Sequence, residues 1–223
     1  MKKNILFILL LFTSMATFAG NDYAKYYQGL PKPMPTVVAP TIPDNNVSIT
    51  ECGGVGDGIT MNTIAFQKAI SKLSKLGGGH LNVPAGIYLT GLISLKDNID
   101  LHIERNAMIL LSPDKTTPGI NASNRKNISI TGEGTIDGNG KWWRAVKRSK
   151  VSDAEWNQFK LMGGTISSNG ELWYPYNLKN FDNIANSAEA QENMRTHLIR
   201  FTSCENVLIQ GVTIQNSPKF HIV

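Results

Sequence analysis

Aromatic and basic side chains gather in residues 140–194, where they could form one wall of a binding site for an acidic sugar. Trp142 and Trp143 stand directly before Arg144, and Trp173 follows about thirty residues later. Indole rings offer an apolar face, and cations pair with a sugar carboxylate through charge-assisted hydrogen bonds. Large aromatic side chains also dominate packing, so the alternative is that these tryptophans anchor the segment on the rest of the protein. Both interpretations stay open at this stage.

Other candidate sites are weaker. Residues 51–58 are rich in Gly, but no Gly-Lys-Ser/Thr follows, and the Gly-Asp-Gly at 56–58 is typical of a turn. His80 and His102 lie in predicted strands, where a structural role is favoured over a ligand role. No pair of His, Cys or carboxylate residues has the spacing of a metal site, so we expect no metal and no cofactor.

One strand-turn-strand unit recurs along the chain. Residues 127–140 and 206–216 each read as Asn, a short aliphatic strand, a Gly corner and a second strand with Thr-Ile; residues 98–103 repeat the opening. Such a unit cannot bury its apolar face alone and stacks on its neighbours, which predicts an all-β solenoid. The Asn either suits a left-handed corner or stacks in register between rungs.

A single amphipathic helix is predicted over residues 62–76, with Asn62 as its N-cap and residues 77–79 ending it. We expect it to cover the open first rung of the solenoid. The predicted strands are residues 46–49, 80–83, 86–90, 92–95, 98–103 and 107–111, with a loop at 113–124 and a short helix within 145–159. Residues 140–194 interrupt the repeat as a long insertion.

The amino-terminal residues 1–19 are predicted to be a secretory signal peptide, with two lysines, a short apolar stretch and a small-residue cleavage site before Gly20. The apolar stretch is far shorter than the ~20 residues of a membrane span, so we expect a secreted or periplasmic protein with no stable membrane insertion. Residues 20–45 form a Pro-rich extended lead-in to the solenoid body, residues 46–223.

The chain carries 22 basic residues, two of them in the signal, against 17 acidic ones, so the mature chain has a formal charge of +3. This suits a polyanionic partner, but the basic residues are too scattered for a nucleic-acid groove. The sequence has two cysteines, Cys52 and Cys204. They could form one long-range disulfide, although free, buried thiols are the favoured interpretation.

The motifs at residues 54–58, 62–70, 77–86 and 132–138 follow one another as in the polygalacturonases, the pectin-degrading glycoside hydrolases of family 28, which the sequence therefore resembles. Residues 216–221 resemble the segment just ahead of the family's active site. The resemblance implies a right-handed, single-stranded parallel β-helix of the pectin-lyase-like type with an N-terminal capping helix. It also implies inverting hydrolysis of α-1,4-galacturonosyl links, an acidic polysaccharide as partner, and a monomer at full length.

The family's catalytic motifs, Asn-Thr-Asp, Asp-Asp, Gly-His-Gly and Arg-Ile-Lys, do not occur in this sequence. We therefore assign no catalytic residue and expect the chain to be an inactive N-terminal portion of a longer enzyme. Lys219 and His221 are predicted to lie near the substrate, or else to decorate the outside of a strand. A polysaccharide lyase of the same fold and a non-catalytic pectin-binding solenoid remain alternatives, as do endo or exo action and homogalacturonan or rhamnogalacturonan as substrate.

Overall fold

The computed structural model describes residues 26–35, 37–112, 119–174 and 195–223. The chain divides into two units, Met1–Val38 and Ala39–Val223. In the described part of the first unit, the amide of Val37 donates to the phenol oxygen of Tyr27 over 2.6 Å. The predicted signal peptide lies outside the described residues. No helix within the described ranges has the length and apolar character that a membrane crossing requires.

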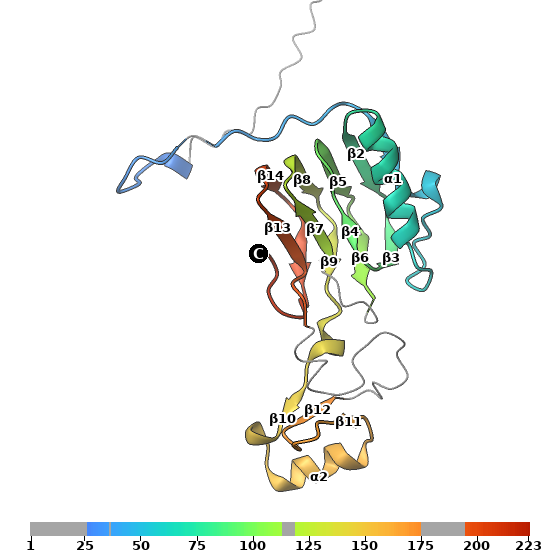
Figure 1. Cartoon of the computed structure of the whole chain (residues 1–223), viewed down its shortest axis with the longest axis vertical. Helices are drawn as coiled ribbons and strands as arrows, with labels where there is room; N and C mark the ends of the chain where they lie inside the picture. The colour runs from blue at the N-terminus through green and yellow to red at the C-terminus, as the bar shows by residue number, and fades with distance from the viewer. Residues whose placement is uncertain (1–25, 36, 113–118, 175–194) are drawn as a thin grey trace, which may run out of the picture. The chain divides into compact units, whose positions relative to one another are not determined.

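Three parallel sheets make up the body of the second unit, and from β2 onward the chain visits them in the order A, B, C (Figure 1). Sheet A contains β1 (Asn46–Ser48), β2 (Gly79–Val83), β5 (Ile99–Ile103), β8 (Lys126–Gly132) and β14 (Glu205–Ile209). Sheet B contains β3 (Gly86–Thr90), β6 (Ala107–Leu111), β9 (Thr135–Asp137) and β15 (Thr213–Gln215). Sheet C contains β4 (Ile93–Ser94), β7 (Ile120–Ser123) and β13 (Ile199–Thr202). Such coiling is a parallel β-helix, so the solenoid prediction is confirmed.

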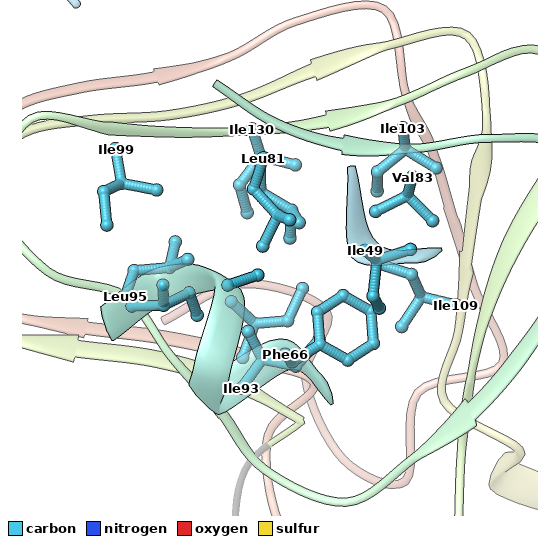
Figure 2. Packing of buried hydrophobic residues seen from close by; sticks show 14 of the residues in the cluster. Ile49, Phe66, Leu81, Val83, Ile93, Leu95, Ile99, Ile103, Ile109 and Ile130 are labelled. Carbon is cyan, nitrogen blue, oxygen red and sulfur yellow. The ribbon is translucent and has the colours of Figure 1, made fainter. Parts of the chain in front are cut away.

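Aliphatic side chains of equivalent strands stack in register inside the coil. Leu81, Leu101 and Ile130 are register partners on β2, β5 and β8, and none of them is exposed. Figure 2 shows the side chains of Leu81 and Ile130 gathered with those of Ile99 and Ile103, and all of them belong to one core cluster. Alternate residues of these strands therefore point inward, and the residues between them stand on the outer face, where functional side chains can lie.

Helix α1 (Thr63–Lys75) follows the short 3-10 helix η2 (Ile49–Cys52) and packs against β1 and β2, where Phe66 and Leu73 are fully buried. The helix thus covers the first rung, as expected. Asn62 is the N-cap residue of α1, as predicted, although its side chain makes no capping bond. Its amide instead accepts from the amide of Val55 over 2.7 Å and donates to the carbonyl oxygen of Leu89 over 3.2 Å, which ties the Gly-rich loop to β3.

Both interpretations of the repeated Asn are confirmed. Asn98, Asn127 and Asn206 all adopt left-handed backbone conformations, with φ of 59°, 54° and 54°. Their side chains also form a ladder, because Asn206 donates to Asn127 over 3.1 Å and Asn127 donates to Asn98 over 2.8 Å. One residue type thus turns the corner and joins neighbouring rungs.

The predicted loop at residues 113–124 is wrong in its second half, where Ile120–Ser123 forms β7; residues 113–118 lie outside the described residues. Strand β13 was not predicted either. Both strands are short and carry polar residues, and they form because they pair with each other in sheet C. The predicted interior strands and the end of α1 agree with the structure within about two residues.

The segment that follows β9 builds a small structure of its own. It contains η3 (Gly140–Trp143), β10 (Val146–Lys147), η4 (Arg148–Lys150), α2 (Asp153–Leu161), β11 (Thr165–Ile166) and β12 (Leu172–Tyr174). The three strands pair antiparallel, in contrast to the rungs. A capping box starts α2, in which Glu155 and Ser152 each accept the other's backbone amide. Residues 175–194 of the predicted insertion lie outside the described residues, and the predicted domain boundaries stay predictions.

Candidate binding site on the outer face of sheet B

Two motifs that are about 79 residues apart in the sequence meet at one corner of the coil. Strands β9 and β15 pair in register, which places Asp137 beside Gln215. The chain after β9 then contacts residues 216–218 directly, because the amide of Gly140 donates to the carbonyl oxygen of Asn216 over 2.7 Å. Both segments belong to the motifs that carry the family resemblance in the sequence.

The carboxylate of Asp137 holds this corner together. Its Oδ2 accepts hydrogen bonds of 2.8 Å each from Gln215 Nε2 and Asn216 Nδ2, and its Oδ1 accepts one of 2.7 Å from the amide of Asn139. The side chain is buried, with 7% of the residue exposed. Hydrogen bonds to an ionised group are about twice as strong as neutral ones, so Asp137 fixes the corner as a rigid element.

Glycine is required where the two segments cross. A Cβ on Gly138 would lie 2.6 Å from the carbonyl oxygen of Asn216 and 2.9 Å from Cδ of Pro218, closer than van der Waals contact permits. Asn139 follows in a left-handed conformation with φ of 51°, and its side chain donates to the carbonyl oxygen of Leu111 over 3.1 Å. The corner is therefore tied to the preceding rung as well as to the following one.

A hollow of about 510 Å³ opens at this corner on the outer face of sheet B, within the size range of ligand sites. Its lining residues are Gly58, Leu89, Leu110, Asp137, Asn139, Gly140, Lys141, Arg144 and Asn216. Because three donors already bind the carboxylate of Asp137, the exposed cations Lys141 and Arg144 determine which charge of ligand the hollow attracts. The arrangement can bind an anion beside an apolar surface.

Two of the three tryptophans that the sequence offered as sugar-binding residues are buried. Trp143 and Trp173 are buried, at 2% and 4% exposed, and the indole of Trp173 donates to the carbonyl oxygen of Gly163 over 2.6 Å and packs on Phe159 with ring centroids 4.8 Å apart. The side chain of Trp142 lies outside what the structure describes. Burial favours the anchoring role for Trp143 and Trp173, because neither ring offers a free face to a sugar. Substrate binding by any of the three stays a prediction.

Lys219 and His221 lie exposed in the carboxyl-terminal stretch, and neither lines the hollow. The carbonyl oxygen of His221 accepts from the amide of Ile199, so this stretch runs beside β13. His197, which the sequence did not single out, stacks on Phe220 with ring centroids 5.4 Å apart. Burial, together with the positive charges of Lys219 and Arg200, lowers the pKa of His197. The predicted roles of Lys219 and His221 stay predictions.

The histidines on sheet A have structural partners, as predicted. His80 Nδ1 lies 2.9 Å from a carboxylate oxygen of Asp100, whose side chain is buried, and His102 Nδ1 lies 2.9 Å from the hydroxyl of Thr131. Among the described residues, no group of three or more His, Cys, Asp or Glu side chains is arranged to hold a metal. Cys52 and Cys204 are free, as the favoured interpretation held, although both are half-buried rather than buried.

The residues of the hollow were largely missed as binding residues. The motif at 132–138 was recognised as part of a rung and of the family resemblance but not as a binding site, although Asp137 and Asn139 organise the corner. Alternation along the strands could have found Leu89 and Leu110, because each stands next to inward-facing Tyr88 or Ile109 and therefore faces outward.

Comparison with known proteins finds relatives that are named as a polygalacturonase and a poly-galacturonosidase. A "Probable polygalacturonase" of Vitis vinifera is 33% identical over 204 residues, covering 76% of this chain and 37% of the relative. An "Exo-poly-alpha-D-galacturonosidase" of Dickeya chrysanthemi is 29% identical over 202 residues, covering 79% of this chain and 33% of the relative. The chain thus spans about a third of the length of these curated relatives. No family model matches the sequence.

Solved structures agree in fold. The exopolygalacturonase of Thermotoga maritima matches with a TM-score of 0.57 and 28% identity, covering 82% of this chain and 44% of that one. A putative glycosyl hydrolase of Parabacteroides merdae matches with a TM-score of 0.56 and 27% identity, covering 80% of this chain and 68% of that one. The right-handed parallel β-helix expected from the sequence is confirmed.

Proposed function

Since this chain is related to the family 28 polygalacturonases in sequence and in its pectin-lyase-like fold, we propose that it takes part in the inverting hydrolysis of α-1,4-galacturonosyl links in pectin. Its own contribution is to bind the acidic polysaccharide. The hollow on sheet B is the observation that carries this proposal, because two cations line it at the corner where the family-like motifs meet.

Polygalacturonate carries a carboxylate on every sugar, and Arg144 and Lys141 can pair with one of them. Arginine matches a planar carboxylate with two parallel hydrogen bonds, and lysine adds a point charge. Asp137 keeps its negative charge, which the neutral donors Gln215, Asn216 and the amide of Asn139 stabilise without cancelling it, but the two cations outnumber it in the lining. The ligand therefore meets a net positive surface.

We further propose that this chain does not hydrolyse its ligand. Inverting hydrolysis requires one carboxylic acid and one carboxylate about 6.5–9.5 Å apart on opposite faces of the sugar. None of the family's catalytic carboxylate motifs occurs in the sequence, and the carboxylate in the hollow has its oxygens engaged by three donors.

Two assays on purified residues 20–223 test these proposals. Calorimetric titration with tetragalacturonate should show saturable binding that weakens as salt is added, because the contact is ionic. Incubation with polygalacturonate should release no reducing ends above the buffer control. Absence of binding at low salt would overturn the assignment of the hollow, and release of reducing ends would overturn the proposed inactivity.

A polysaccharide lyase of the same fold is the first alternative. A lyase abstracts the proton at C5 with a basic group and leaves an unsaturated product that absorbs in the ultraviolet. An increase in ultraviolet absorbance on incubation with polygalacturonate would therefore favour the lyase.

A non-catalytic binding solenoid is the second alternative, and one relative favours it. The "Plasmin and fibronectin-binding protein A" of Streptococcus pneumoniae is 30% identical over 183 residues, covering 81% of this chain and 22% of the relative. Retention of the chain on immobilised fibronectin, but not on pectin, would favour this function over the proposed one.

We also propose that the protein is exported after cleavage before Gly20, on the strength of the signal-like residues 1–19. Mass spectrometry of protein recovered from the culture medium or periplasm should give a chain that starts at Gly20. A cytoplasmic chain that retains Met1 would contradict export.

A further inference from the structure

The hollow on sheet B has an apolar wall that the binding of a free uronate does not explain. Leu89 on β3 pairs in register with Leu110 on β6, and Leu110 pairs with Asp137 on β9. Adjacent strands lie about 4.8 Å apart, so these three residues form one straight row on the outer face. The row changes from apolar to polar between Leu110 and Asp137.

Both leucines are partly exposed, and both line the hollow together with Lys141 and Arg144. Single exposed leucines are common on protein surfaces and need no explanation. Two of them in register, inside a concave site that also holds two cations, form a composite surface. One part of this surface attracts a carboxylate, and the other part repels it, because a carboxylate placed against leucines would lose water without gaining a partner.

We propose that the hollow binds a galacturonosyl chain in which a free uronate faces Arg144 and Lys141 and a neighbouring uronosyl unit, whose carboxyl group is methyl-esterified, lies against Leu89 and Leu110. This inference rests on the proposed function and specifies its ligand. Esterification removes the charge that the wall disfavours and supplies a methyl group that the wall can bury. The site thus selects partly esterified pectin over fully de-esterified polygalacturonate.

The test compares two probes on residues 20–223 by calorimetry at one salt concentration: trigalacturonate without esters, and trigalacturonate with a single methyl ester. The esterified probe should bind about fourfold more tightly, the worth of one buried methyl group. Equal affinities, or tighter binding of the unesterified probe, would overturn the inference and leave acidic-sugar binding in place. Failure of both probes to bind would overturn the proposed function as well.

Two variants test whether the methyl ester binds against Leu110. Leu110→Ser should bring the ratio of the two dissociation constants close to one, because it removes the centre of the apolar wall. Met108→Ser is the matched control, since Met108 lies on the same strand, is also half-buried and does not line the hollow; it should keep the fourfold ratio. A preference that survives Leu110→Ser, or that Met108→Ser abolishes, would contradict the placement of the ester.

Discussion

Replacing Asp137 with alanine should destabilise the protein strongly, because this side chain joins three segments of the corner. Three hydrogen bonds to its carboxylate would be lost. Each bond to a charged group contributes about 1.5–3 kcal/mol, but Gln215 and Asn216 can turn their amides towards solvent and recover part of that. We therefore expect a loss of about 2–4 kcal/mol in the free energy of unfolding, a drop of about 4–16 °C in melting temperature for a chain of this size.

Thermal melts followed by circular dichroism measure this effect, and Glu133→Ala is the matched control. Glu133 lies four residues earlier, its side chain is 60% exposed, and it pairs with Arg105 on the surface. Exposed ion pairs contribute about 0–1 kcal/mol, so this control should melt within about 4 °C of the parent. Asp137→Asn, which keeps one acceptor oxygen, should fall between the two. If Asp137→Ala melted with the control, the corner would not depend on this carboxylate and the reasoning would be refuted.

Three further predictions concern the asparagine ladder, the Gly-rich loop and the two cysteines. Asn127→Gly should lower the free energy of unfolding by about 1–3 kcal/mol, because it removes two ladder bonds while glycine tolerates φ of 54°. Asn127→Ala should lower it by about 1–2 kcal/mol more, because alanine disfavours that left-handed conformation. Equal urea midpoints for the two variants would show that the left-handed corner does not contribute. Hydrogen bonds from backbone amides of the turn, that of Thr60 first, lower the pKa of Asp57 to about 2. The contribution of Asp57 to stability is therefore present above about pH 4 and is lost as the pH falls towards 2. Asp57→Asn should flatten the urea midpoint as a function of pH between about pH 4 and 2, and an unchanged slope would contradict this prediction. Cys52 and Cys204 should both react with a thiol reagent in the unfolded, unreduced protein, whereas no reaction would indicate a disulfide.

The sequence was sufficient to predict the solenoid because the repeat lies in local patterns. Aliphatic residues alternate along β2, β5 and β8, and Gly or Asn occupies the corners where left-handed backbone is needed. Each of these signals is complete within a few residues, so no tertiary information is required. Helix α1 followed in the same way from its apolar face.

What the sequence did not predict depends on pairing between rungs. Strands β7 and β13 are too short and too polar to be recognised alone, and they form only because each has a partner in sheet C. Asn62 occupies the N-cap that its position predicted, but its side chain does not cap the helix and binds the backbone of Val55 and Leu89 instead. Propensity is a weak prior where such tertiary bonds compete.

The candidate site likewise combines a local motif that the sequence shows with residues that only pairing between rungs brings together. The motif around Asp137 was visible in the sequence, but its neighbours Leu89 and Leu110 come from earlier rungs that only the register of sheet B aligns. Trp143 and Trp173 had the right chemistry for a sugar site, and burial decided against exposed ring faces. Residue type therefore suggested candidates, and register and burial selected among them.

The most direct test of the account is hydrogen exchange of residues 20–223 with and without tetragalacturonate, read by mass spectrometry peptide by peptide. We predict that the ligand slows exchange in peptides that cover residues 137–144 and 215–216, which form the cationic corner on sheet B. Peptides that cover residues 102–105 and 131–133, which line a second hollow on sheet A, should be unaffected. Protection confined to that second hollow, or no protection anywhere at saturating ligand, would contradict the assignment of the site.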